Sequence, residues 1–202
     1  NKQMVYYTAT ADLSRDDVHI FANYKDNDPT SWGMQPVLTQ ANAAQNKYGN
    51  PESELYIENY NVIASINGDG FNMGTGEPGG LLIMDGTEYH GPSKNGFFGI
   101  TKDGKAVIGT TDEYNTIYKD QLQEAIGGFG ARLIKNGVIQ DGPSSDYYTT
   151  RHSRTAIGIT RTGKVVFMVL DGRQEPVSCG GSMAEIAHIM FEAGCVEAIN
   201  LD

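Results

Sequence analysis

TAIGITRTGKVVFMVL, residues 155–170, holds two apolar runs on either side of a short polar turn. Residues 155–159 and 165–170 are rich in the β-branched and aliphatic side chains that favour strands. The turn Arg161-Thr162-Gly163 lies between them, and its glycine accommodates the reversal of the chain. The pattern predicts an antiparallel hairpin, which is the clearest pair of strands in the sequence.

Downstream of this hairpin lies the strongest helix signal, over residues 183–193. Ser182 and Glu185 form the S-x-x-E pattern of a capping box, so we interpret Glu185 as a capping residue. Gly194 follows the last helical residue, as a glycine commonly does at a helix C-terminus. One side of the helix is apolar and is expected to be buried. The residues of this stripe are Met183, Ile186, Ala187, Met190 and Phe191.

Residues 196–201 follow the helix as a further strand and lead to Asp202. The run is apolar on both sides of its pleat, which is the pattern of a central strand buried on both faces. A central strand needs a neighbour on each edge, because unpaired buried N–H and C=O groups are costly. We therefore expect additional polypeptide beyond Asp202 to complete the fold.

Shorter strands joined by tight turns predominate before the hairpin. Asp85-Gly86, Lys102-Asp103-Gly104 and Asn136-Gly137 are turns of the kind that connect antiparallel strands. The strands expected from apolar runs are residues 5–11, 19–24, 80–84, 97–100, 106–109, 131–134 and 138–140, with an apolar run at 61–66 and helices at 35–48 and 118–126. Residues 1–202 are expected to form a single α+β domain, with a mixed, mostly antiparallel sheet and two or three flanking helices.

Net charge argues against a nucleic-acid partner, the apolar runs are too short for a membrane span, and the two cysteines leave one disulfide possible. A formal net charge of −10 at pH 7 argues against a large phosphate backbone, so we expect no nucleic-acid partner. The sequence has no stretch that approaches the roughly 18 uninterrupted apolar residues of a membrane span, so we expect no transmembrane segment. Cys179 and Cys195 are interpreted as buried or half-buried thiols, with a disulfide between them left open.

Polar residues interrupt the apolar framework at the ends of predicted strands. A guanidinium binds a carboxylate or phosphate bidentately, and glycine-rich loops let the backbone approach an anion. Each group taken singly fits an ordinary turn or a solvated surface equally well. The groups are Asn67-Gly68-Asp69-Gly70-Phe71 with Glu77 downstream, Arg151-His152-Ser153-Arg154, Asp171-Gly172-Arg173 and Asn200-Leu201-Asp202.

The histidines give no metal signal. Only His152, beside Arg154, is placed near a site. The four histidines lack metal-ligand spacing, so we expect neither a metal nor another cofactor. They are His19, His90, His152 and His188.

Taken in order, these groups resemble the phosphodiester glycosidase domain family. The family pattern starts with N-G-x-x-F and a glycine-rich stretch with an acid, continues with R-T-A-x-G and D-G-[RH], and ends after a helix on N-L-D-G-G-G-S. The matches here are residues 67–71 with Glu77, Arg154-Thr155-Ala156-Ile157-Gly158, Asp171-Gly172-Arg173, the helix at 183–193 and Asn200-Leu201-Asp202. Each motif is weak by itself, but all of them occur in order over roughly residues 60 to 202.

The sequence departs from the family pattern in two respects. The family often has Gly where this chain has Asp69, and a second aromatic where this chain has Asn72. Asp69 is therefore a weaker catalytic candidate than Asn67 or Arg154. The chain also ends at Asp202, before the G-G-G-S of the family.

The resemblance implies a hydrolase that cleaves the glycosidic C–O bond of a sugar-1-phosphate diester, releasing free sugar and a phosphomonoester. Asp171 or Asp202 would be the base or nucleophile, and Arg154 or Arg173 would bind the phosphate. We expect Arg154 to face the ligand and to contribute little to stability. The expected catalytic residues are Asp171, Asp202 and Arg154, and the expected substrate-binding residues are Asn67, Asp69, Glu77, Arg173, His152 and Asn200.

The resemblance also implies a carbohydrate or sugar-phosphate substrate, a bacterial source and a secreted or cell-surface location. Three other classes of function stay open. They are a non-catalytic glycan- or phosphate-binding module of the same fold, a phosphodiesterase that cuts the P–O bond, and a structural cell-surface protein. Cleavage of the P–O bond normally calls for a metal, whose ligands this sequence does not cluster. Acids and arginines at successive strand ends favour the glycosidase.

Overall fold

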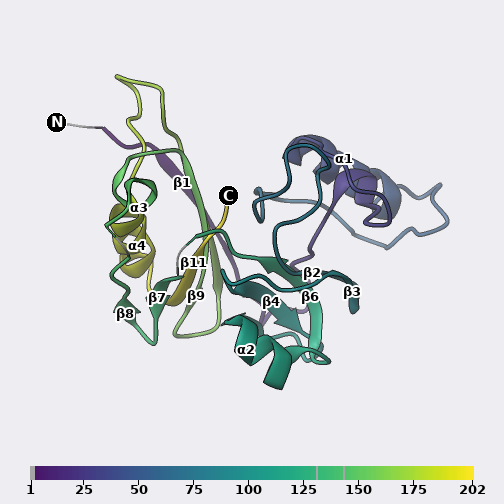
Figure 1. Cartoon of the computed structure of the whole chain (residues 1–202). Coiled ribbons are helices and arrows are strands. Elements are labelled where there is room, and N and C mark those ends of the chain that lie inside the picture. The colour runs from purple at the N-terminus through teal and green to yellow at the C-terminus, as the bar shows by residue number, and fades with distance from the viewer. Residues whose placement is uncertain (1–2, 131, 143) are drawn as a thin grey trace.

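Strands outnumber helices in this chain, and they divide between two sheets (Figure 1). A computed structural model describes residues 3–130, 132–142 and 144–202. Within these residues the paired strands are antiparallel, in a six-stranded and a five-stranded sheet, with four short α-helices. The α+β class predicted from the sequence is confirmed.

The six-stranded sheet is built around the predicted hairpin. β9 (Arg154–Thr160) and β10 (Val165–Leu170) pair antiparallel from Val165↔Ile159 to Leu170↔Arg154. β11 (Cys195–Asn200) lies between β9 and β7, so the predicted central strand is confirmed. The strand order is β1-β10-β9-β11-β7-β8, in which β1 is Tyr6–Ala11, β7 is Arg132–Lys135 and β8 is Val138–Ile139. Ala131, at which we expected β7 to begin, lies outside the described residues.

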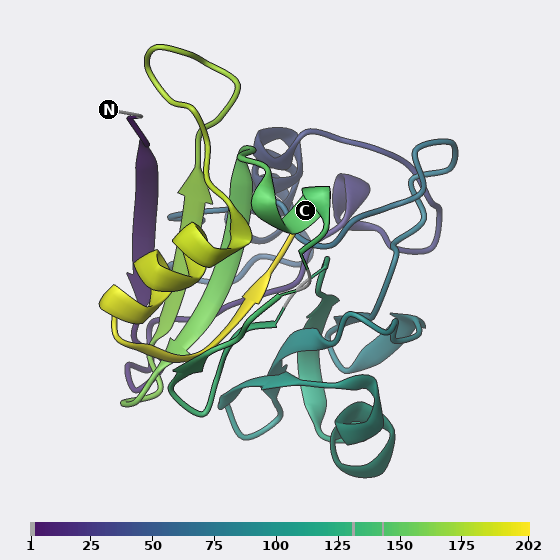
Figure 2. The same ribbon diagram turned by 60° about the vertical axis from the view of Figure 1, so that its left-hand side comes forward.

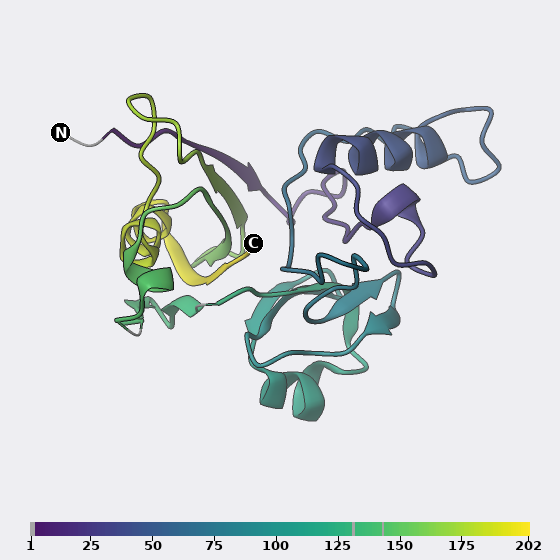
Figure 3. The ribbon, with the colours of Figure 1, turned by 45° about the horizontal axis from the view of Figure 1, so that its top comes forward.

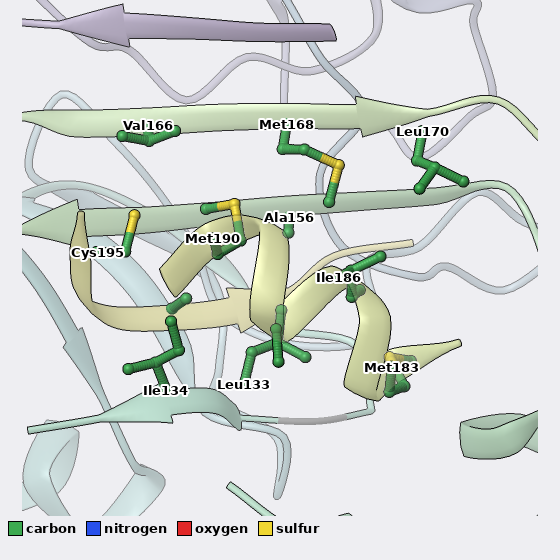
Figure 4. Packing of buried hydrophobic residues seen from close by; sticks show 12 residues of the cluster. Leu133, Ile134, Ala156, Val166, Met168, Leu170, Met183, Ile186, Met190 and Cys195 are labelled. Carbon is green, nitrogen blue, oxygen red and sulfur yellow. The ribbon is translucent and has the colours of Figure 1, made fainter. Parts of the chain in front are cut away.

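One face of this sheet is covered by α4 (Met183–Glu192). The capping box is confirmed, because the Glu185 N–H donates to Ser182 Oγ at 3.3 Å and the Ser182 N–H donates to the Glu185 carboxylate at 2.9 Å. Gly158 permits the close packing, since a Cβ atom there would lie 2.7 Å from Cys195 Sγ. Figure 4 shows the buried cluster between helix and sheet, which includes Leu133, Ile134, Ala156, Val166, Met168, Leu170, Met183, Ile186, Met190 and Cys195.

The opposite face of the six-stranded sheet packs against the second sheet. Ile157, Ile199 and Leu201 are each 1% exposed and share a buried cluster with Phe98 and Ile108 of the second sheet. β11 is therefore buried on both faces as well as paired on both edges. This arrangement is what its uninterrupted apolar pattern predicts.

The five-stranded sheet contains two of the predicted hairpins. Its order is β3-β2-β6-β4-β5. The turn at Asp85-Gly86 joins β2 to β3, and the turn at Lys102-Asp103-Gly104 joins β4 to β5, as predicted. The strands are β2 (Leu82–Met84), β3 (Thr87–His90), β4 (Phe97–Thr101), β5 (Ala106–Gly109) and β6 (Leu122–Gly127).

The helix expected at residues 118–126 is wrong. The chain instead forms α2 (Thr111–Glu113) and the π-helical turn η2 (Tyr114–Tyr118), and then enters β6. Tyr118, Leu122 and Ala125 have a spacing that suits a helix. Pairing with β2 on one edge and β4 on the other holds the segment extended, so tertiary contacts override the local pattern.

The segment that follows β1, up to residue 66, lies beside the second sheet and apart from α4 (Figures 2 and 3). It contains the short 3-10 turn η1 (Lys25–Asn27) and α1 (Val37–Tyr48), which confirms the helix predicted at 35–48. The fourth α-helix, α3 (Asp146–Thr149), lies near α4.

The strand expected at residues 19–24 is wrong, because this described segment pairs with neither sheet. It is attached by side chains instead. The Ala22 N–H donates to Glu124 Oε2 at 3.0 Å, and Tyr24 Oη lies 2.6 Å from the Gly76 carbonyl oxygen. The apolar run at 61–66 is also unpaired, and its Ile63 is 85% exposed.

The two cysteines are free thiols, so the disulfide that the sequence left open is not formed. Cys195 is buried beneath α4, and Cys179 is half-buried. Among the described residues, none of the helices combines the length and the apolar character needed to cross a membrane.

Glu124 of β6 gives the fold a pH dependence. The side chain is buried, where its carboxylate accepts from the backbone N–H groups of Ala22 and Asp85. Burial raises the pKa of Glu124 from 4.5 to about 7. Between these two values the unfolded chain releases the proton while the folded chain keeps it. This group therefore lowers the stability of the fold as the pH rises from about 4.5 to about 7.

We predict that Glu124→Gln reduces the loss of unfolding free energy between pH 4.5 and pH 8. The difference from the wild type should be on the order of 2–3 kcal/mol, because one pKa unit corresponds to about 1.4 kcal/mol. Urea denaturation across this pH range measures it. Equal pH dependence in the two proteins would contradict the assignment.

The capping box gives a second prediction. Glu185→Ala should lower the unfolding free energy by roughly 0.5–2 kcal/mol, because the Ser182 N–H loses its acceptor. Glu185 also pairs with Arg151, so the matched control is Glu185→Gln, which removes the charge and retains a capping acceptor. Chemical denaturation should rank the stability as wild type, Gln variant, Ala variant. A Gln variant as unstable as the Ala variant would assign the loss to the ion pair.

Candidate active site

A cavity of about 530 Å³ opens where β9, β10 and β11 bring polar chain segments together. Six of the nine residues expected from the sequence line it. They are Asn67, His152, Arg154, Asp171, Arg173 and Asp202. The other lining residues are Phe129, Tyr147, Ser153, Thr155, Val169, Leu170 and Leu201. Residues separated by more than a hundred positions in the sequence thus surround one space.

Asp202 reaches the cavity because the end of β11 is fixed by hydrogen bonds. The Leu201 N–H donates to the Thr155 carbonyl at 2.8 Å, and the Asp202 N–H donates to the Gly68 carbonyl at 2.9 Å. Partial burial raises the pKa of the Asp202 carboxyl. Its position and its readiness to hold a proton both suit a general acid or base.

The Asn67 side chain is hydrogen-bonded to the backbone of Asp202 and to Thr155. Its side-chain N–H donates to the backbone carbonyl oxygen of Asp202, and its amide oxygen accepts from Thr155 Oγ1 at 2.6 Å. These bonds join the start of the glycine-rich turn (residues 67–80) to β9 and to the end of β11. We expected Asn67 to bind substrate, and the geometry gives it a positioning role at the cavity wall.

Asp171 and Arg173 enter the cavity from the loop after β10. The Asp171 N–H donates to the Val5 carbonyl at 2.9 Å, and Ser178 Oγ donates to the Asp171 carbonyl at 2.6 Å. Arg173 is exposed and has a φ of 60°, in the left-handed region that residues other than glycine seldom occupy. A non-glycine residue held there at a cavity is a feature common at functional sites.

Arg154 is placed differently from our expectation. It is only 5% exposed, and its guanidinium donates to three carbonyl oxygens and lies over the Tyr147 ring. The acceptors are Tyr147 at 2.7 Å, Thr150 at 3.1 Å and Gly181 at 3.3 Å. The side chain joins α3 and the loop before α4 to β9, so these contacts favour a contribution to stability, in contrast to the expectation from the sequence.

His152 lines the cavity together with Arg154 and Arg173. Burial lowers its pKa, and the charges of Arg154 and Arg173 lower it further. Its backbone pairs with Gly181, which fixes the segment that leads into β9. A neutral imidazole at this place suits a hydrogen-bonding role toward an anion held by the arginines.

Two aromatic side chains of the cavity were missed from the sequence. Phe129 and Tyr147 lie edge to face with ring centroids 5.9 Å apart. The Phe129 N–H donates to the Asn200 carbonyl at 2.9 Å, which ties this wall to β11. The run Gly127-Gly128-Phe129-Gly130 was the available signal, because an aromatic residue among glycines is exposed to close approach by a ligand.

Asn200, Asp69 and Glu77 do not line the cavity. Asn200 is fully buried, and its amide donates to the Phe129 and Leu201 carbonyls, so it positions the wall. The carboxyl oxygens of Asp69 are shielded from solvent, and burial raises its pKa to about 7. Glu77 lies 3.7 Å from His90 at the far side of the glycine-rich turn. Direct contact of these three side chains with substrate therefore finds no support in the geometry.

The donors around the cavity suit an anion and a sugar. The part of the chain that the structure describes contains no group of three or more His, Cys, Asp or Glu side chains arranged for a metal ion. The cavity combines two carboxylates, two guanidinium groups and an aromatic wall. These groups can bind an anion, pack against a pyranose ring and move a proton.

A family model described as phosphodiester glycosidase matches residues 60–202. The chain belongs to the phosphodiester glycosidase family. Two curated relatives are the N-acetylglucosamine-1-phosphodiester alpha-N-acetylglucosaminidases of Mus musculus and Homo sapiens. Each is 30% identical over 153 residues, covering 67% of this chain and 29% of the relative. The chain thus spans less than a third of the length of these relatives.

Two solved structures are similar to this phosphodiester glycosidase chain. The catalytic domain of the zebrafish N-acetylglucosamine-1-phosphodiester alpha-N-acetylglucosaminidase, auto-inhibited by its pro-peptide, matches with a TM-score of 0.56 and 26% identity, over 67% of this chain and 49% of that one. A hypothetical protein from Synechocystis matches with a TM-score of 0.68 and 16% identity, over 100% of this chain and 54% of that one. The similarity to the Synechocystis protein supports the fold alone.

In this phosphodiester glycosidase chain the motifs of the resemblance meet in space. The family match covers Asn67, Arg154, Asp171, Arg173 and Asp202, which share one cavity. Their order along the sequence therefore reflects one site built from the ends of neighbouring strands. The individual roles of these side chains stay predictions.

The position of Arg154 leads to a stability prediction. Arg154→Ala should lower the unfolding free energy by at least about 1–3 kcal/mol, because buried carbonyl oxygens lose their donor. Arg173→Ala is the matched control and should stay within about 0.5 kcal/mol of the wild type, because Arg173 is exposed. Urea denaturation compares the two. Equal stability of the variants would show that the carbonyl contacts of Arg154 are unimportant to the fold.

Proposed function

We propose that the protein of which this chain is part is a hydrolase that cleaves the glycosidic C–O bond of a sugar-1-phosphate diester. The single observation that carries the proposal is the cavity in which Asp171 and Asp202 face the same space as Arg173 and His152. Family membership supports the general chemistry. The products would be the free sugar and a phosphomonoester on the other alcohol.

The cavity divides into a part for the phosphate and a part for the sugar. The exposed Arg173 provides a cation, and the half-buried His152 provides a hydrogen-bonding imidazole. Phe129 and Tyr147 provide an aromatic wall, and aromatic rings of this kind pack against the face of a sugar ring. A substrate bound across both parts places its anomeric carbon near the two carboxylates.

The two acids suit the bond to be broken. A phosphomonoester leaves readily with the electrons of the C–O bond, so the reaction needs less general-acid help than cleavage of an ordinary glycoside. The remaining requirements are to stabilise an oxocarbenium-like transition state and to deliver water. One carboxylate accepts the proton of the attacking water, and the raised pKa of Asp202 makes it suitable for holding that proton.

Cleavage in water labelled with ¹⁸O tests the proposal. The full-length protein is incubated with an N-acetylglucosamine-1-phosphodiester, which is the class named for the curated relatives. We expect the label in the released sugar, since water attacks the anomeric carbon. Label in the phosphate would assign the protein to the phosphodiesterases that cut the P–O bond. Binding without any cleavage would favour a non-catalytic sugar-phosphate-binding module.

The two carboxylates give a further prediction. Asp171→Asn and Asp202→Asn should each reduce kcat by at least about 100-fold, because neither amide can accept a proton or stabilise positive charge. Arg173→Ala should mainly weaken substrate binding and raise KM, since the phosphate loses a charged donor. Steady-state kinetics measures these effects. Full activity in both carboxylate variants would overturn the site assignment.

A further inference from the structure

Asp69 is a buried carboxyl that the proposed mechanism does not use. Neither of its side-chain oxygens has a hydrogen-bond partner among the described residues, and both are shielded from solvent. The large majority of buried polar groups in native structures have a hydrogen-bond partner, so an unpartnered buried carboxyl is unusual. The carboxyl is therefore a feature to be explained and not an ordinary turn residue.

Glycines form a close enclosure around this carboxyl. A Cβ atom on Gly80 would lie 2.8 Å from Asp69 Oδ2, and one on Gly79 would lie 3.7 Å from it. A Cβ atom on Gly127 of β6 would overlap the same oxygen. The absence of side chains at these positions leaves room for the carboxyl between the glycine-rich turn (residues 67–80) and the second sheet.

The backbone links Asp69 to the candidate active site. The carbonyl of the preceding Gly68 accepts from the Asp202 N–H at 2.9 Å, and Asn67 donates to the Asp202 carbonyl. Gly68 and Asn67, the two residues before Asp69, therefore bind the N–H and the carbonyl of Asp202. Asp69 thus follows directly, along the chain, the two residues whose hydrogen bonds fix Asp202.

Few charges face the Asp69 carboxyl. Asp202 and His90 are the titratable groups that act on it, and Asp202 is of like charge when ionised. His90 directs Nδ1 at the Gly80 carbonyl, 2.8 Å away, and its Nε2 lies 3.7 Å from Glu77. The hydroxyl of Ser93 also lies beside Gly80, since a Cβ atom on Gly80 would meet it at 2.9 Å.

An ionised Asp69 would therefore be a poorly compensated buried charge. Burial is the largest effect and raises the pKa of Asp69 to about 7. The amides of Gly70 and Gly80 lower this pKa without reaching hydrogen-bond geometry, and the charge of Asp202 raises it further. Near neutral pH the carboxyl changes its charge within this enclosure. Ionisation favours rearrangements that bring the carboxylate to water.

We propose that Asp69 is a positioning residue, which holds the glycine-rich turn and through it Asp202 in place only while its carboxyl is neutral. This inference rests on the proposed function for its effect on catalysis, but the coupling between Asp69 and Asp202 is a property of the fold. The ionisation of Asp69, which lies outside the cavity lining, thereby sets the upper limit of the pH range in which the site is active.

The direct test follows the backbone amide of Asp202 by NMR between pH 5.5 and 8.5. The wild type should show an inflection in the Asp202 amide shift near pH 7, and Asp69→Asn should lack it because the amide side chain stays neutral. Glu124→Gln is the matched control, since it removes another buried carboxyl outside the cavity lining, and it should keep the inflection. Asp69→Ala is measured alongside, because it removes the charge with a smaller side chain if Asn does not fit.

Each outcome decides the inference. An inflection that persists in the Asp69 variants, or its absence in the wild type, would overturn it. In kinetics, kcat/KM of the wild type should fall as the pH rises through 7, and Asp69→Asn should shift this alkaline limb upward by about one pH unit or more. If the wild type cleaves no sugar phosphodiester at any pH, the proposed function fails, while the NMR titration still decides the coupling.

Discussion

The central strand β11 is the constraint on which the rest of the structure depends. It pairs with β9 on one edge and with β7 on the other, and its side chains belong to two separate buried clusters. The register of a strand held on four sides is strongly specified. The last residues of this strand are therefore delivered to one place, and that place is the cavity with Asp202 at its wall.

The site is assembled from chain segments that end at this strand or beside it. β9 begins with Arg154 and β10 ends just before Asp171, so the antiparallel hairpin brings both ends to the same edge of the sheet. The glycine-rich turn approaches from the second sheet and joins Asp202 through Gly68. The packing of the strands therefore determines where the acids and arginines converge.

The sequence predicts well those parts of the molecule that depend on local signals. The hairpin of β9 and β10, the capped helix α4 and the central strand β11 each have a continuous apolar pattern with a turn or cap at its end. β6 was predicted as a helix because its extended form depends on partners that lie far away in the sequence. The segment at 19–24 failed for a related reason, since a hydrogen bond to Glu124 holds it without a strand partner.

The candidate site follows the same division. Motif order identified six side chains of the cavity, and all of them except Asn67 lie within three residues of an end of β9, β10 or β11. It did not reveal that Arg154 is bonded to carbonyl oxygens, that Asn200 is enclosed or that Tyr147 forms a wall, since those facts depend on α3 and on the loop before α4.

The most direct test of the account is a crystal structure of the full-length Asp171→Asn protein with an N-acetylglucosamine-1-phosphodiester. The account predicts the phosphate at Arg173 and His152, the sugar against Phe129 and Tyr147, and the anomeric carbon facing Asp202 and residue 171; a substrate bound with its anomeric carbon away from both positions would contradict it.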